Sequence, residues 1–188
     1  MTYKKYLFEA ITTRGGDEGL STLYNGERRP KDDPIFCVLG DLDELNSFLG
    51  WVKSSKEASA ILRERIETLQ RALFRVGAMV ATPPTDPLFA SLDKITDQDL
   101  FQLEALEHRV LESVEIPERF VLPGSTSLSA QLDICRTICR RAERSLVTLI
   151  RQRGIQELFP CQRYINRMSD YLYLLARWAE GEKEREKT

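Results

Sequence analysis

Apolar side chains recur along this chain at alternating spacings of three and four residues, which place them on one face of an α-helix. Residues 127–153 show the pattern most clearly, with a stripe made of Leu128, Leu132, Cys135, Cys139, Ala142, Leu146 and Leu149. The same spacing predicts helices over about 34–52, 56–81, 96–117 and 161–180. No strand-like alternation competes with it. We therefore predict an all-α fold, a five-helix bundle in which each helix buries one apolar face.

Residues that stop or start a helix lie between these segments. The run TPPTDP at residues 82–87 ends the second helix, and we expect residues 83–95 to form a mobile loop. Thr96 and Asp99 resemble an acidic form of the capping box, which predicts the start of the third helix at this point.

The length of 188 residues suffices for one domain with a sizeable core, so we expect a single domain over residues 1–188. Residues 1–32 are rich in Gly and Thr and predict an ordered loop or a short extended segment. Residues 33–180 form the predicted helical bundle. The tail GEKEREKT, residues 181–188, is expected to be solvated.

Composition and charge narrow the class of protein. Hydrophobic residues make up 42% and charged residues 30%, as in globular proteins in water. A net charge of -2 gives no general basic footprint for nucleic acid. No apolar run is long enough to span a bilayer, and the first residues lack the apolar region of a signal peptide. We expect a cytoplasmic protein with neither a nucleic-acid nor a membrane partner.

The four cysteines are too few for a disulfide scaffold in a chain of this size, which favours a reducing compartment. Cys135 and Cys139 are four residues apart on the apolar stripe, and that spacing also suits a metal site. With His108 as the only histidine in the sequence, free buried thiols are the favoured interpretation. A single histidine also argues against His-based catalysis, so an enzyme here would act by positioning and electrostatics.

The segment RTICRRAER, residues 136–144, places arginines beside the apolar stripe. Arg suits polyphosphate because its planar fork bonds two oxygens at once and remains charged. An ordinary exposed face, or salt bridges at an interface, is the alternative. We favour a site for an anionic ligand. Helical geometry places Arg136, Arg140, Glu143 and Arg144, with Asp133 one turn earlier, on the flank of the stripe and points Arg141 elsewhere.

A second cluster is TRGGDEGLST at residues 13–22, where Gly15, Gly16 and Gly19 permit backbone conformations closed to other residues. Consecutive amides in such a loop can form a concave nest for an anion. Arg14 and Lys31 add positive charge. A plain turn is as consistent with this segment by itself.

Two further helical faces carry polar groups outside the apolar stripes. One consists of Asp43, Asn46 and Ser47, where a carboxylate can pair with an arginine of the fourth helix, in the same chain or a neighbour. The other consists of Asn166, Asp170, Tyr173 and Arg177. Solvated faces, helix caps and interhelical hydrogen bonds are the alternatives for both.

Five motifs, in this order, resemble those of the PduO-type ATP:cob(I)alamin adenosyltransferases. The motifs are TRGGDEG at 13–19, GERRPKDDP at 26–34 followed by GDLDELNS at 40–47, FVLPGSTS at 120–127, RTICRRAER at 136–144 and NRMSDYLYLLAR at 166–177. They extend over nearly the whole chain, and their combination is specific although no single motif is.

The resemblance implies a five-helix bundle that assembles as a homotrimer with active sites between subunits. Members of the family transfer the 5′-deoxyadenosyl group of ATP to Co(I) of cobalamin or a related corrinoid and release triphosphate. ATP and cob(I)alamin are therefore the implied substrates. Mg²⁺ is implied with ATP, and a reductase that supplies Co(I) is an implied partner.

Site residues are carried over position by position. The glycine-rich loop implies ATP binding by Thr13, Arg14, Gly16, Asp17, Gly19 and Ser21. Lys31, Arg140, Glu143 and Asn166 match further ATP-binding positions, with Mg²⁺ near Glu143. Arg136 matches an arginine that pairs across the subunit interface with an aspartate, here Asp43. Phe120 matches the aromatic residue that blocks the lower face of the corrin and leaves cobalt four-coordinate. The resemblance thus assigns catalysis to Arg136, Arg140, Asp43 and Phe120.

Three positions depart from the family pattern: Gly15, where Thr or Asn is common, Ser125, where Gly is common, and Asp133, where many members have His. Asp133 adds negative charge near the arginines and is expected to weaken phosphate affinity or alter corrinoid preference. Two other interpretations are a non-catalytic sensor or carrier of nucleotide or corrinoid, and a purely structural bundle. The nucleotide-site residues retained alongside Phe120 favour catalysis.

Overall fold

The computed structural model describes residues 8–116, 118 and 120–185, with side chains described as far as Gly181. In chain order the elements are α1 (Phe8–Ile11), β1 (Leu20–Thr22), β2 (Arg28–Pro30), α2 (Pro34–Ser54), α3 (Ala60–Val80), α4 (Pro87–Ser91), α5 (Asp97–Leu111), α6 (Ser127–Arg153), a 3-10 turn (Gln156–Leu158) and α7 (Phe159–Arg185).

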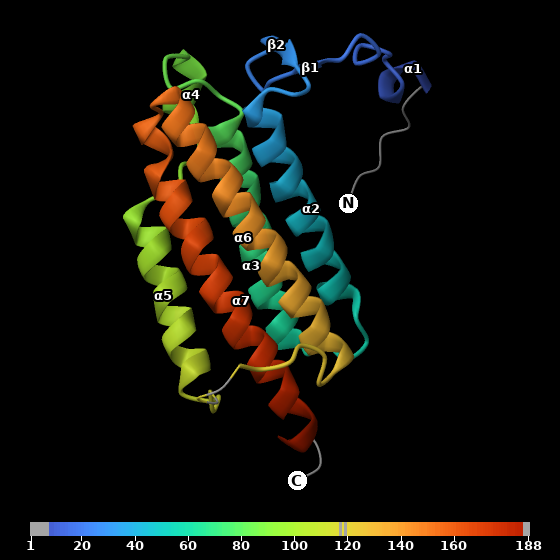
Figure 1. Cartoon of the computed structure of the whole chain (residues 1–188), viewed down its shortest axis with the longest axis vertical. Helices are drawn as coiled ribbons and strands as arrows, with labels where there is room; N and C mark the ends of the chain where they lie inside the picture. The colour runs from blue at the N-terminus through green and yellow to red at the C-terminus, as the bar shows by residue number, and fades with distance from the viewer. Residues whose placement is uncertain (1–7, 117, 119, 186–188) are drawn as a thin grey trace.

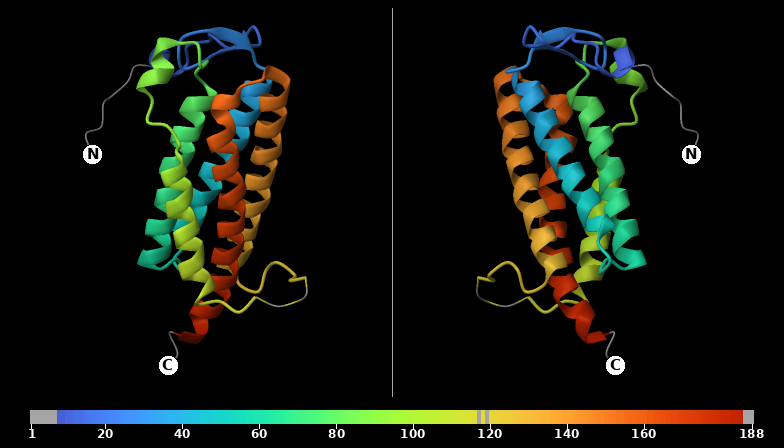
Figure 2. Two further views of the ribbon diagram at one scale, coloured as in Figure 1. Left: turned by 90° about the vertical axis from the view of Figure 1, so that its left-hand side faces the viewer. Right: turned by 90° about the vertical axis from the view of Figure 1, so that its right-hand side faces the viewer.

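The five long helices form the bundle that the sequence predicts (Figure 1). Helix α6 packs against both α7 and α2, while α3 packs against α2 and α5 packs against α7. The small β1–β2 hairpin lies at one end of the bundle, and residues 120–126 lie at the opposite end (Figure 2). Within the described residues, no helix is long and apolar enough to cross a membrane.

Helix α6 is the central element because its predicted apolar stripe is wholly buried. Every member of the stripe is 0–2% exposed: Leu128, Leu132, Cys135, Cys139, Ala142, Leu146 and Leu149. Burying one Leu side chain contributes about 1.5–3 kcal/mol, so this stripe is a large part of what holds α6 in place. A capping box of Thr126 and Ser129 begins the helix, and Gly154 ends it in the left-handed conformation (φ 66°).

The interhelical segment at residues 83–95 corrects one expectation. It contains the short helix α4, so residues 87–91 are not loop. Asp86 caps the helix by accepting a hydrogen bond from the amide of Leu88, and Pro87 occupies the first helical position. Phe89 is 7% exposed and packs into the core, which fixes this segment to the bundle.

Helix α5 begins as predicted, with Thr96 and Asp99 forming the capping box. Its expected end near residue 117 is wrong, because α5 stops at Leu111 and Pro117 itself lies outside the described residues. The Ser113 hydroxyl donates to the carbonyl of Val110, a local bond that competes with a further helical turn.

Helix α7 is longer than predicted at both ends. It begins at Phe159 rather than near Cys161, and it continues to Arg185, so the first residues of the expected tail are helical. Residues 186–188 of that tail, and residues 1–7 of the N-terminal segment, lie outside the described residues.

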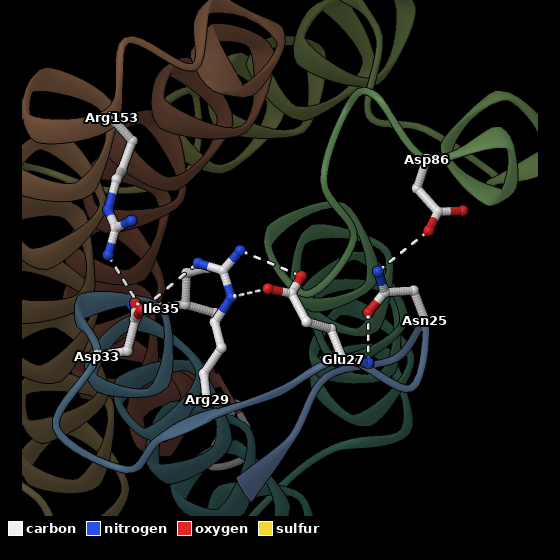
Figure 3. A network of polar contacts seen from close by, with 7 residues as sticks. All are labelled: Asn25, Glu27, Arg29, Asp33, Ile35, Asp86 and Arg153. Atoms are coloured by element: carbon white, nitrogen blue, oxygen red, sulfur yellow. Dashed lines mark hydrogen bonds and ion pairs between the residues drawn. The ribbon is translucent and has the colours of Figure 1, made fainter. Parts of the chain in front are cut away.

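A polar network ties the hairpin to the end of the bundle (Figure 3). Asp33 caps α2 by accepting from the amide of Ile35, and the same carboxylate pairs with Arg153 at 3.0 Å and Arg29 at 3.4 Å. Asn25 donates to Asp86 across 3.0 Å. Lys31, which directly follows β2, is therefore carried on a well-anchored segment.

Candidate functional site

Helices α6 and α7 bring the predicted nucleotide residues Glu143 and Asn166 together. Asn166 Nδ2 donates to Glu143 Oε1 across 2.9 Å, and this bond joins the two helices on their outer face. Arg140 lies one turn before Glu143 and is exposed. Among the described residues no carboxylate pairs with the Arg140 guanidinium, so its charge is available to an anion. We call Arg140, Glu143 and Asn166 the α6–α7 face.

A cavity of about 320 Å³ adjoins the α6–α7 face, within the size range of small-molecule sites. Helices α5, α6 and α7 form its walls. The lining residues are Glu107, His108, Leu111, Arg136, Arg140, Ser169, Asp170, Tyr173 and Leu174. Two arginines thus point their charge toward a space that is otherwise lined by mixed polar and apolar groups.

A second cavity, of about 670 Å³, lies toward the end of the bundle that carries residues 120–126. We call it the Phe120 cavity. Phe120 is fully exposed, and Leu122 close by is 87% exposed. Side chains this apolar and this exposed commonly mark a binding surface. The lining residues are Glu118, Phe120, Val121, Pro123, Asp133, Arg136, Tyr173 and Arg177.

Arg136 lines both cavities and is held by Asp133, one turn earlier on α6, with Nε 3.3 Å from Oδ1. Asp133, expected to add negative charge near the arginines, is itself paired with two of them. It is 5% exposed, and its other oxygen accepts from Arg177 Nη2 across 2.6 Å. Arg177, also 5% exposed, was predicted only as a member of a polar stripe.

The glycine-rich loop lies against Lys31. A Cβ atom on Gly16 would lie 2.8 Å from Lys31 Nζ, so the end of the lysine side chain occupies the space that glycine leaves open. Arg14 (φ 56°) and Gly19 (φ 76°) are in the left-handed region, and the amide of Lys31 donates to the carbonyl of Gly19 across 2.8 Å. The predicted ATP residues Thr13, Arg14, Gly16, Asp17, Gly19, Ser21 and Lys31 thus form one local group, which we call the glycine loop.

Within one chain the glycine loop and the α6–α7 face do not share a site. At the end of the bundle that carries the hairpin, Arg153 in the last turn of α6 pairs with Asp33, the N-cap of α2, whereas Arg140 lies more than three turns earlier. At a rise of about 1.5 Å per residue, Arg140 and Arg153 are separated by about 20 Å along the helix axis. Helix α1 and the loop after it extend outward at the hairpin end of the bundle (Figure 1).

Asp43 and Arg136 are likewise not in contact within the chain. Asp43 is exposed on α2 and has no ion-pair partner among the described residues. The carboxylates of α2 that pair with α6 are instead Asp41, 2.8 Å from Arg141 Nε, and Glu44, which contacts the same guanidinium. The turn spacing of Asp41 and Glu44 was the available signal for this pair.

Glu107 is a site residue that the sequence did not single out. Its Oε1 atom is buried with no hydrogen-bond partner, and its Oε2 atom lies 3.8 Å from Arg167 Nε. Burial raises the pKa of Glu107 to about 7, against the lowering effect of Arg167, and Asp170 and Glu104 raise it further. A carboxyl group that titrates near neutrality therefore lines the cavity beside Arg136 and Arg140.

The cysteines are free, and Cys135, Cys139 and Cys161 are buried. Burial raises the pKa of Cys135 and Cys161 to about 12 and that of Cys139 still higher, so these thiols are unreactive packing groups. In the described part of the chain, no group of three His, Cys, Asp or Glu side chains is arranged to hold a metal ion by itself.

Fold and site together define a helical-bundle protein that presents an unpaired arginine, Arg140, beside a cavity and a lysine-bearing glycine loop at one end of the bundle. Residues 11–179 match the cobalamin adenosyltransferase family, and the chain belongs to that family.

Among the similar proteins is the human corrinoid adenosyltransferase MMAB, which is 36% identical over 93% of this chain and 72% of its own. The Citrobacter freundii corrinoid adenosyltransferase is 37% identical over 90% of this chain and 94% of its own. A solved structure of a single-residue variant of the Lactobacillus reuteri PduO-type ATP:corrinoid adenosyltransferase, complexed with cobalamin and ATP, is 33% identical with a TM-score of 0.83. The match covers 93% of this chain and 95% of that one.

Proposed function

We propose that this chain transfers the 5′-deoxyadenosyl group of ATP to Co(I) of cobalamin or a related corrinoid, forming adenosylcobalamin and triphosphate. The observation that carries the proposal is the pair of cavities that share Arg136, one beside Arg140 and the other beside Phe120. Membership of the cobalamin adenosyltransferase family and the similarity to a protein solved with both ligands support it. The 5′-deoxyadenosyl group is bonded through a carbon atom, so the proposed reaction is the transfer of an alkyl group.

The reaction needs no nucleophilic side chain. The electron pair of Co(I) attacks C5′ of ATP, the cobalt–carbon bond forms, and the bond from C5′ to the triphosphate oxygen breaks. Cobalt leaves the step as Co(III) with its new alkyl ligand, and the electron pair of the broken bond leaves with triphosphate. The protein must hold cobalt, C5′ and the leaving oxygen in line and stabilise the departing charge.

ATP is assigned to the α6–α7 face and the glycine loop. Arg140, unpaired and exposed, contacts the triphosphate, while Lys31 and the loop residues contact it from the other side. Asn166 orients Glu143 through the 2.9 Å bond to Oε1 and leaves Oε2 of Glu143 without a partner in the described chain.

That free oxygen fits Mg²⁺, which in nucleotide sites takes one or two carboxylates besides phosphate oxygens and water. Glu143 is therefore the protein group that would hold the ion. When bound, Mg²⁺ would neutralise part of the triphosphate charge.

The corrinoid is assigned to the Phe120 cavity. A bulky apolar ring beneath the corrin excludes water and other lower ligands from cobalt. Because an axial ligand stabilises the higher oxidation state, its removal makes Co(II) easier to reduce to Co(I). A reductase in the cytoplasm is the proposed source of the electron.

We propose a homotrimer, in which a neighbouring subunit supplies the part of the site that one chain lacks. Arg140 lies about 20 Å along α6 from Arg153, at the end of the bundle that carries the hairpin, so one chain does not close the site alone. A neighbouring chain that places its glycine loop over Arg140 completes it. The same arrangement gives exposed Asp43 a partner in Arg136 of the next subunit.

The test mixes the protein, Mg-ATP and chemically reduced cob(I)alamin without oxygen and follows the visible spectrum. The proposal predicts a light-sensitive adenosylcobalamin spectrum that depends on both protein and ATP. Binding of nucleotide and corrinoid without a new cobalt–carbon bond would favour the alternative, a non-catalytic sensor or carrier on the same bundle.

A further inference from the structure

Asp133 joins two arginines that have different surroundings. Its Oδ2 atom accepts from Arg177 across 2.6 Å, and its Oδ1 atom accepts from Arg136 across 3.3 Å. Because Asp133 is 5% exposed, its charge requires compensation inside the protein. Arg177 supplies part of that compensation but also pairs with Glu180, so Arg136 supplies the rest through the second oxygen of Asp133.

Arg177 is fixed from several directions. Its Nη2 atom also lies 3.2 Å from Glu180, and its guanidinium stands over the ring of Tyr173 at 5.4 Å. Arg177 is therefore held by groups other than Asp133, and it fixes the position of the Asp133 carboxylate. This anchored carboxylate presents its other oxygen in a fixed place on the wall of the Phe120 cavity.

Arg136 is fixed only through Nε. Its two terminal nitrogens have no hydrogen-bond partner among the described residues, and its side chain lines both cavities. An Arg side chain has several rotatable bonds, and ordering it has an entropic cost. A contact at Nε orders most of this side chain in advance and leaves its terminal nitrogens free to bond groups outside this chain, among them Asp43 of a neighbouring subunit in the proposed trimer.

We propose that Asp133 is a positioning residue for corrinoid binding: anchored by Arg177, it holds Arg136 in the wall between the two cavities. The inference rests on the proposed function. Asp133 is assigned no contact with ATP, because it has no bond to the proposed ATP-binding residues Arg140, Glu143 and Asn166. Its loss therefore affects use of the corrinoid more than use of ATP.

The substitution Asp133→Asn isolates this role. An amide has one acceptor oxygen, which Arg177 takes through the shorter bond, and the amide nitrogen then faces Arg136 Nε, donor against donor. The matched control is Glu180→Gln, which removes the other carboxylate on Arg177 and leaves the bond from Asp133 to Arg136 intact. Steady-state kinetics with cob(I)alamin and with ATP varied separately give the readout.

We expect Asp133→Asn to lower kcat/KM for cob(I)alamin about tenfold, the size of one charge-assisted hydrogen bond. The KM for ATP should change less than about twofold, and Glu180→Gln should change neither by more than that. In an Arg136→Ala background, compared at a protein concentration at which both variants are trimeric, Asp133→Asn should have little further effect, because the residue through which it acts is gone. Asp133→Glu, which retains both oxygens, should recover part of the loss.

Equal losses for ATP and corrinoid, or an undiminished effect in the Arg136→Ala background, would overturn the inference while leaving the proposed function intact. If the wild-type protein does not transfer the adenosyl group, both the inference and the proposed function are wrong. Should Asp133→Asn fail to fold around a buried Arg177, Asp133→Leu with Arg177→Met replaces the pair by apolar groups. Against Arg177→Met alone, that double variant should show the same corrinoid-selective loss, and its absence would contradict the inference.

Discussion

Asn166 of α7 and Glu143 of α6 form a hydrogen bond of 2.9 Å, with the amide nitrogen donating to Oε1. The bond fixes the carboxylate and leaves its second oxygen without a partner among the described residues. Arg140, one turn away, carries the opposite charge without an ion-pair partner among them. An acceptor for a cation and a donor for an anion thus stand side by side, which suits the Mg-ATP complex that we propose binds here.

Arg140→Ala should impair use of ATP without unfolding the protein, because the side chain is exposed and forms no ion pair with any of the described residues. A charge-assisted contact is worth about 1.5–3 kcal/mol, so kcat/KM for ATP should fall about tenfold to a hundredfold. Arg144→Ala is the matched control, since Arg144 is exposed one turn later and donates a hydrogen bond to the backbone carbonyl of Arg140. Wild-type kinetics in folded Arg140→Ala would remove this arginine from the site.

Asp43 and Arg136 should pair between subunits. Removing one partner of a buried ion pair costs about 3–5 kcal/mol, so Asp43→Ala and Arg136→Ala should each weaken the trimer measured by analytical ultracentrifugation. The double variant should lose less than the sum. Arg141→Ala is the control, because its partners Asp41 and Glu44 lie in its own chain. Strict additivity of the Asp43 and Arg136 effects would show that the two residues do not interact.

Phe120→Ala should retain ATP binding and lose the four-coordinate form of Co(II). The ring is fully exposed, so its removal should cost little stability. Electron paramagnetic resonance of cob(II)alamin with ATP and protein gives the readout. The variant should be most defective when a reductase supplies electrons and less so with ready-made cob(I)alamin. A four-coordinate signal equal to that of the wild type would contradict the role of Phe120.

Glu107 makes stability depend on pH in a defined direction. Its pKa is raised to about 7 by burial, whereas an unfolded Glu titrates near about 4.3. The folded protein therefore holds this proton more tightly, and the associated stability is present at low pH and lost as pH rises from about 4.3 to about 7.

Glu107→Gln is neutral at every pH, so its Tm should exceed that of the wild type above about pH 7 and approach it near about pH 4.5. Each kcal/mol corresponds to about 2–4 °C for a chain of this length. Glu104→Gln, which also faces Arg167, should show no such gain. A Tm difference for Glu107→Gln that does not change with pH would contradict the assignment.

The bundle and much of the site were predictable from periodicity and motif. The stripe along α6 follows directly from helical spacing, and the meeting of Glu143 with Asn166 follows from two motifs assigned to one ligand. Helix α4 was missed because five residues are too few to show a helical period. Its Asp86–Pro87 start was the available signal.

The environment of Asp133 was not predictable in the same way. Spacing along α6 places Asp133 on the flank of the stripe, where it was expected to add negative charge near the arginines. Asp133 is buried where α7 places Arg177 against it. This is a contact between two helices, and no pattern within one helix reveals it. The same reason explains why Arg141 was not matched with Asp41 and Glu44.

The central claim is best tested by following the carbon that is transferred. ATP labelled with ¹³C at C5′ is mixed without oxygen with the protein, Mg²⁺ and cob(I)alamin, and the products are examined by NMR and quantified. The account predicts that the label becomes the carbon bound to cobalt and that one triphosphate appears for each cobalt–carbon bond. Release of phosphate or pyrophosphate with no labelled cobalt–carbon bond would contradict it.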